Sequence, residues 1–109
     1  MQKDGYMIML FVKDGYEKGN WLGVLSAINK SAEQKNIDGI IVTNISIDNL
    51  RAGAPEEFHA FTPVLCDATA IKTAARANPT LYLLKKGTII GKWSYADFDR
   101  VLITLQNLP

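Results

Sequence analysis

The most reactive side chain in this sequence belongs to a single cysteine, Cys66, which stands directly before Asp67 at the start of a predicted helix. The dipole at a helix N-terminus stabilises a thiolate, but the adjacent carboxylate opposes its formation. One cysteine cannot form a disulfide within the chain, so its chemistry would require a mixed or intermolecular disulfide. Cys66 is therefore the one catalytic candidate, and its simpler interpretation is a small buried hydrophobic residue.

Other residue types offer less chemistry. His59 is the only histidine in the sequence. Together with the single cysteine it provides too few ligands for a structural zinc site, which needs four. We therefore expect no metal and a structural or surface role for His59. Lys72 and Arg76 are four residues apart on a predicted helix and are typical of a solvated face. The sequence contains no phosphate-binding loop, nucleophile elbow or HExxH motif, and we expect no cofactor.

Length and charge narrow the class of protein. A chain of 109 residues is large enough for one hydrophobic core, so we expect a single domain spanning 1–109. Its 12 basic and 11 acidic residues give a net charge of +1, which offers no reason to expect a nucleic-acid partner. No stretch approaches the roughly 20 apolar residues that span a bilayer, so we expect the domain itself to be soluble.

The first half of the sequence alternates between strand and helix patterns. Tyr6–Val12 is a continuous apolar run, typical of a central strand buried on both faces. A helix is predicted from Trp21 to about Gln34, with Asn20 as its cap. The β-branched residues in Gly39–Ile45 predict a second strand, and a strand, helix and strand at this spacing form a right-handed parallel crossover.

The second half begins with short helical segments. A short helix is predicted within Ser46–Ala54, and Pro55 followed by two acidic residues is typical of a new helical start. Asp67 is expected to cap a further helix with an inward face formed by Ile71, Ala74 and Ala75.

A hairpin and a final helix follow. Asn78-Pro79 ends the preceding helix, and because proline cannot donate a backbone hydrogen bond it is expected at the mouth of the strand Leu81–Leu84. A turn with a glycine precedes the return strand Ile89–Trp93. Ser94 and Asp97 have capping-box spacing, with Asp in place of Glu. The buried stripe of the last helix is formed by Phe98, Val101, Leu102 and Leu105.

This order of elements, with Pro79 opening the hairpin, resembles a thioredoxin-like domain over nearly the whole chain. The resemblance implies an α/β fold, namely a mixed β-sheet with helices on both faces. It also implies that the Asn78–Pro79 peptide bond is cis and that the backbone beside it can pair with an extended peptide. The segment Phe61–Asp67 resembles the additional extended piece of the peroxiredoxin-like and thiol-disulfide-reductase branches.

The sequence departs from the redox-active members in two places. In those members a Cys-x-x-Cys stands at the start of the first helix, but Lys18–Gly23 contains no cysteine, and Tyr6–Val12 lacks a buried carboxylate. We therefore expect a non-catalytic module that binds a protein or an extended peptide. The candidate binding residues are Asn20, Trp21, Asn78 and Pro79, with Tyr16 as a further candidate; Trp21 and Trp93 also fit a simple packing role.

A narrower resemblance is to the soluble domain that follows the membrane-spanning part of some DoxX-type membrane proteins. It implies that an upstream region, outside this sequence, anchors the protein in a membrane whose side is unknown. Three functions remain open: a protein- or peptide-binding module, a single-cysteine redox protein acting through Cys66, and a structural appendage of the membrane part. The narrower resemblance is carried by Cys66-Asp67, Ile71-Lys72-Thr73, Arg76, Asn78-Pro79, Leu83–Gly87, Ile90, Lys92-Trp93-Ser94 and Asp97.

Overall fold

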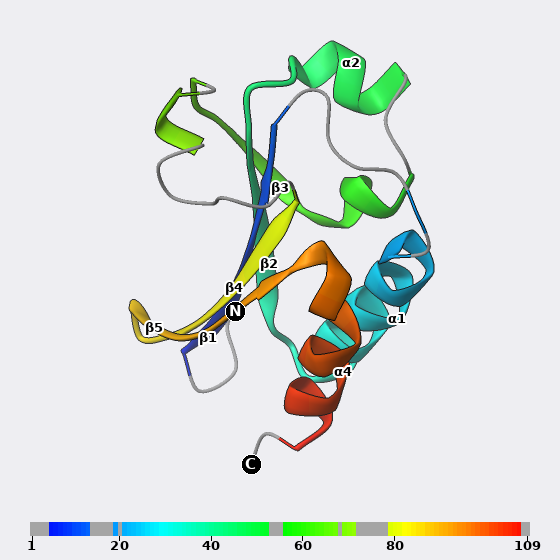
Figure 1. Ribbon diagram of the computed structural model, residues 1–109, viewed down its shortest axis with the longest axis vertical. Helices are drawn as coiled ribbons and strands as arrows, with labels where there is room; N and C mark the ends of the chain where they lie inside the picture. Colours follow the sequence, from blue (N-terminus) through cyan, green and yellow to red (C-terminus); the bar gives the residue numbers. More distant parts are fainter. Residues whose placement is uncertain are drawn as a thin grey trace.

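The computed structural model describes residues 5–13, 19, 21–52, 56–67, 69–71 and 79–107 (Figure 1). Within these residues one mixed sheet of five strands has the order β3-β2-β1-β4-β5. The strands are β1 (Tyr6–Val12), β2 (Asp38–Thr43), β3 (Thr62–Leu65), β4 (Thr80–Lys85) and β5 (Thr88–Ser94). The helices are α1 (Trp21–Gln34), α2 (Ile47–Ala52) and α4 (Phe98–Gln106), with 3₁₀ turns η1 (Glu56–Ala60) and η2 (Tyr95–Asp97).

The sheet is mixed because its two halves have different connections. β1, β2 and β3 are parallel, whereas β4 is antiparallel to both β1 and β5. The long α1 connection joins the parallel pair β1 and β2, and a two-residue turn joins β4 to β5, as expected for these two kinds of pairing. The predicted mixed α/β sheet is confirmed.

The central strand β1 is covered on both faces, as its apolar run predicted. Ile8, Leu10 and Val12 belong to a core cluster that also contains buried residues of α1 and α4. Figure 1 shows these two helices together on one side of the sheet. On the other face Phe11 packs with Val42, Ile71 and Tyr82. Ile71 lies in the helical residues 69–71, so described helical residues pack on both faces.

The end of α1 fixes the start of β2. Asn36 has a φ of 56°, in the left-handed region that helix C-termini favour. Its N–H donates to the carbonyl of Glu33, and the N–H of Ile37 donates to that of Ala32 at 2.8 Å. This pair of hydrogen bonds is a Schellman motif, and the side chains of Ala32 and Ile37 are both buried beside it. β2 therefore begins at Asp38, one residue before the predicted start.

β3 forms one edge of the sheet and confirms the predicted extended segment. The N–H of Cys66 donates to the carbonyl of Thr43 at 2.9 Å, which shows that the backbone of residue 66 is directed toward β2. Because backbone direction alternates along a strand, Thr62 and Val64 also face β2, whereas Pro63 and Leu65 face outward. The position of the missing N–H of Pro63 is therefore on the free edge of β3. Its absence there breaks no hydrogen bond of the sheet, and it discourages pairing with another strand.

The β4–β5 hairpin closes through Lys86 and Gly87, whose φ values are 50° and 82°. Positive φ at both positions is typical of a type I′ turn, whose twist matches the flanking strands. The N–H of Lys86 also donates to the carbonyl of Gly5 at 2.8 Å, which ties the turn to the start of β1.

Two local predictions about helix ends have different outcomes. The cap by Asp67 is confirmed, because its Oδ1 accepts a hydrogen bond from the N–H of Ala70 at 2.9 Å. The capping box of Ser94 and Asp97 is wrong, since neither side chain makes a capping hydrogen bond and the α-helix starts only at Phe98. Because a 3₁₀ turn intervenes, Ser94 is the N-cap residue of η2 and Asp97 that of α4, so the two residues do not stand at the N-cap and third position of one α-helix. Asp is also one methylene shorter than the usual Glu.

Two further predictions need qualification. The new helical start near Pro55 is a 3₁₀ turn rather than an α-helix. Asn20, Ala74, Ala75 and Asn78 lie outside the described residues. No helix within the described residues is both long and apolar enough to cross a bilayer.

Gly91 of β5 allows the indole of Trp93 to lie directly over the strand, because a Cβ at position 91 would overlap the ring. Gly91→Ala should therefore displace Trp93 from the core cluster that it partly covers, and lower the free energy of unfolding by about 1–3 kcal/mol. Urea denaturation measures this change.

Gly23→Ala is the matched control. Gly23 is exposed within α1, and a Cβ there meets nothing within 4 Å. This variant should gain up to about 1 kcal/mol from helix propensity. Equal stabilities for the two alanine variants would contradict the packing of Trp93 over Gly91.

Candidate functional site

Trp21 is the first residue of α1, at the end of the molecule where the resemblance places the site. Its side chain is only 5% exposed and belongs to the core. The indole stacks on the ring of Phe58, with 6.1 Å between the ring centroids. It meets the ring of Phe98 edge-on, with 5.9 Å between the centroids. These contacts fix the indole in one position, so it can form a rigid wall but offers little exposed surface of its own.

Pro79 is buried directly before β4, as predicted for a proline at the mouth of a strand. Its carbonyl accepts a hydrogen bond from the N–H of Tyr95 at 3.0 Å. This bond joins the start of the hairpin to η2 and brings Pro79 and Tyr95 together. The carbonyl of Pro79 is therefore already paired within the chain.

A cavity of about 330 Å³ lies between the start of α1 and the η2–α4 junction. Its described lining residues are Gly19, Trp21, Val24, Tyr95, Ala96, Phe98 and Asp99. Most of them are aromatic or aliphatic, and Asp99 is the one carboxylate among them. Because few of these described residues are polar, this part of the lining suits an apolar side chain rather than a strongly charged group.

Sequence analysis identified only Trp21 among these lining residues as a binding candidate. Phe98 was predicted to be part of the buried stripe of the last helix, which it also is. Tyr95 and Ala96 lie inside the predicted capping box of Ser94 and Asp97, which indicates a helix start and not a binding site. Only the tertiary packing of α4 against α1 brings them to this position. The other binding candidates, Asn20 and Asn78, and the further candidate Tyr16, lie outside the described residues.

Cys66 lies at the end of β3 and is a free, half-buried thiol. It packs against the cluster of Phe11, Val42, Ile71 and Tyr82, on the face of the sheet opposite to α1. Trp21 belongs to the cluster on the other face. The sheet therefore separates the cysteine from the cavity beside Trp21.

His59 has a structural contact. Its Nε2 lies 3.0 Å from the carbonyl oxygen of Leu50, and because a carbonyl only accepts, Nε2 carries the proton. This hydrogen bond ties η1 to α2. Within the described ranges there is no group of three or more His, Cys, Asp or Glu side chains that could hold a metal ion.

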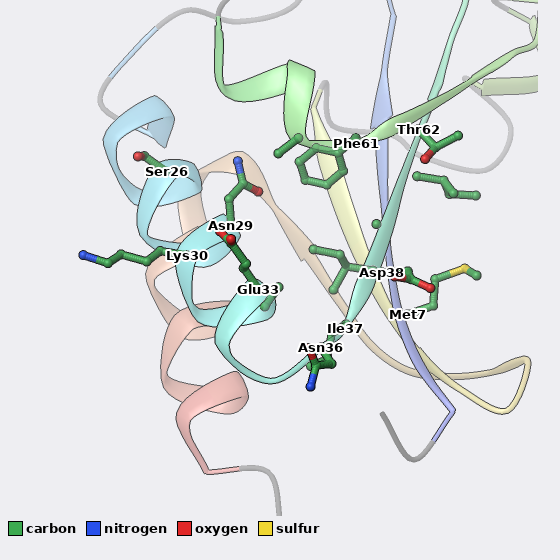
Figure 2. A pocket seen from close by; sticks show the side chains of 15 residues that line it. Met7, Ser26, Asn29, Lys30, Glu33, Asn36, Ile37, Asp38, Phe61 and Thr62 are labelled. Carbon is green, nitrogen blue, oxygen red and sulfur yellow. The ribbon is translucent and has the colours of Figure 1, made fainter. Parts of the chain in front are cut away.

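A larger groove, of about 920 Å³, lies beside the second half of α1 (Figure 2). It is formed by α1, the start of β2, and the junction of η1 with β3, far along α1 from Trp21. It therefore does not coincide with the position that the resemblance implies. Sequence analysis missed it, because its walls come from separate segments that carry no shared motif.

No family model and no curated protein matches this sequence. Solved structures do match over most of its length. A thiol:disulfide interchange protein from Bacteroides sp. matches with a TM-score of 0.66 and 18% identity, over 97% of this chain and 74% of the other. A domain of a possible thiol-disulfide isomerase from Cytophaga hutchinsonii matches with a TM-score of 0.60 and 20% identity, over 97% of this chain and 78% of the other.

A third match is the bacterioferritin comigratory protein of Xanthomonas campestris, whose structures concern alkyl peroxide reduction. Its TM-score is 0.57 and its identity 13%, over 94% of this chain and 79% of the other. Identities this low show the shared architecture and not a shared reaction. With the strand order and the helical layers described above, they show that this chain has a thioredoxin-like fold.

Proposed function

We propose that this chain is a thioredoxin-like module that binds an extended segment of a partner protein without catalysing disulfide exchange. The observation that carries the proposal is the apolar cavity beside Trp21 and Tyr95, which contains no thiol because the single cysteine lies across the sheet. The proposed peptide-binding cavity is thus on the opposite face of the sheet from the only thiol of the chain.

The position of Cys66 supports the loss of dithiol catalysis. In thiol–disulfide exchange a thiolate attacks a disulfide, and a second thiol resolves the mixed disulfide that results. This chain has one cysteine and therefore no resolving partner of its own. A substrate segment seated beside Trp21 would also be separated from Cys66 by the sheet.

The cavity indicates how a peptide would be held. Because the carbonyl of Pro79 already accepts the N–H of Tyr95, it is not an open backbone partner for an incoming strand. The main anchor is then one apolar side chain of the peptide, inserted between Trp21 and Tyr95 and packed against Val24. Burying such a side chain supplies about 1.5–3 kcal/mol before the cost of ordering the peptide.

The proposal includes a place for this module in a DoxX-type membrane protein. It is supported by the resemblance carried by Cys66-Asp67 and by the β4–β5 hairpin. The full coding sequence tests it, because at least one run of about 20 apolar residues should precede this domain. A coding sequence without such a run would remove the membrane part of the proposal and leave the binding part intact.

Filling the cavity should weaken peptide binding. Ala96 is exposed and lines the cavity, so Ala96→Trp should block the anchor pocket without disturbing the core. We expect peptides selected from a displayed random library on the unmodified protein to bind this variant at least about tenfold more weakly, as loss of one buried side chain implies. Fluorescence polarisation with the selected peptides measures the change.

Ala52→Trp is the matched control, because Ala52 is exposed on α2 and does not line the cavity. Peptides that bind both variants with unchanged affinity would place the binding surface elsewhere and contradict the proposal. Failure to select any peptide would favour the structural-appendage function.

The single-cysteine redox function is a second candidate, because Cys66 is free and only half-buried. Packing against Ile71 and Val42 should nevertheless restrict access. We expect iodoacetamide to label Cys66 several-fold more slowly in the folded protein than in urea, as measured by mass spectrometry. Labelling as fast as in urea would favour the redox function. An oxidation-dependent crosslink that Cys66→Ser abolishes would establish it.

A further inference from the structure

The larger groove exists because β3 is shorter than β2. β3 begins at Thr62, opposite Ile40, so no strand of the described residues covers this edge of β2 at Asp38 and Gly39. Gly39 also lacks the side chain that would press against Phe61, since a Cβ there would lie 3.0 Å from the phenyl ring. Phe61 can therefore close one end of the groove, and α1 forms its long wall (Figure 2).

The floor of the groove is apolar, and its volume of about 920 Å³ is typical of a site for a small molecule. The side chains of the floor come from four different segments and are buried in the core. They are Ile8, Ala32, Ile37 and Phe61. This floor favours a ligand with an apolar body.

The wall on α1 presents hydrogen-bond acceptors. Nδ2 of Asn29 donates to the carbonyl of Glu57 at 3.0 Å, and because that carbonyl only accepts, the orientation of the amide is fixed and leaves Oδ1 as an acceptor. Figure 2 shows Asn29 and Glu33 on the groove side of the helix, whereas Lys30 extends away from it. The wall is therefore polar, with one carboxylate and one amide carbonyl.

The charges that line the groove disfavour an anion. Glu33 and Asp38 each carry a negative charge, and Lys30 is the only basic residue in the described part of the lining, which therefore has a net charge of −1. A phosphate or carboxylate would meet no guanidinium or inward-facing ammonium here. An ammonium group, in contrast, would donate both to Oδ1 of Asn29 and to the carboxylate of Glu33.

We propose that this groove binds a primary amine with an apolar body: the ammonium group lies against Asn29 and Glu33, and the apolar body lies on Ile8, Ile37 and Phe61. The site is separate from the cavity beside Trp21, and the proposal does not depend on peptide binding there.

The test is a titration of the isotopically labelled protein with 2-phenylethylamine, followed by amide chemical shifts. We expect saturable shifts in the second half of α1 and the first residues of β2, with no comparable shifts in α4. The neutral analogue 2-phenylethanol has the same apolar body without the ammonium group, and should bind at least about threefold more weakly, as loss of one partly exposed charge pair implies. A third ligand, N-acetyl-lysine-N-methylamide, tests a lysine side chain as the source of the amine.

Glu33→Gln removes the charge of an exposed side chain and keeps its shape. It should therefore weaken binding of 2-phenylethylamine by a factor similar to that expected for the neutral alcohol. Glu56→Gln is the control, because it removes a nearby negative charge from a residue that does not line the groove. This variant should retain the affinity of the unmodified protein for the amine.

Three results would overturn the proposal. They are the absence of saturable shifts, equal affinity for the amine and the alcohol, and an equal loss of affinity in Glu33→Gln and Glu56→Gln. Tighter binding of the lysine derivative than of 2-phenylethylamine would support ammonium recognition and identify a protein side chain as the source. The reverse order would identify a free amine.

Discussion

The structure depends on one constraint, which is that β1 is apolar on both faces and must be covered on both. Ile8, Leu10 and Val12 require the layer that α1 and α4 supply, while Phe11 requires the cluster with Tyr82 on the other side. Because side chains of a strand alternate between faces, a one-residue shift of β1 would exchange these two sets. The same burial fixes α1 beside the sheet, and with it the positions of both cavities.

The fold could be predicted because its signals are local. The apolar run of β1, the helical spacing of α1 and the turn around Gly87 each indicate one element, and the order of elements leaves few topologies. The predicted bounds of α1 agree with the structure, whereas β2 starts one residue earlier and ends two residues earlier than predicted. The capping box failed because spacing alone cannot distinguish an α-helical first turn from a 3₁₀ turn.

The sites could be predicted only in part, because they are assembled by tertiary packing. Trp21 and Pro79 were identified from a resemblance, and the structure places them at the same end of the molecule. Tyr95 became relevant only through tertiary packing, which places it in the lining of the cavity and brings its N–H to the carbonyl of Pro79. The groove beside Asn29 depends on where β3 begins relative to β2, and a register of this kind is not encoded in any short motif.

Edge protection and the proposed amine site lie in the same parallel half of the sheet. Pro63 removes a donor from the free edge of β3, which discourages non-specific strand pairing there. Beyond the start of β3, the uncovered edge of β2 is enclosed by α1 and Phe61 instead. The sheet thus has a blunted strand edge next to the groove.

The central claim is that this thioredoxin-like domain has kept recognition without dithiol catalysis. The most direct measurement is the rate at which the purified protein accelerates reduction of insulin disulfides by dithiothreitol. Our account predicts a rate equal to that of dithiothreitol alone, since Cys66 has no resolving thiol within the chain. Multiple turnovers per protein molecule that disappear in Cys66→Ser would contradict it.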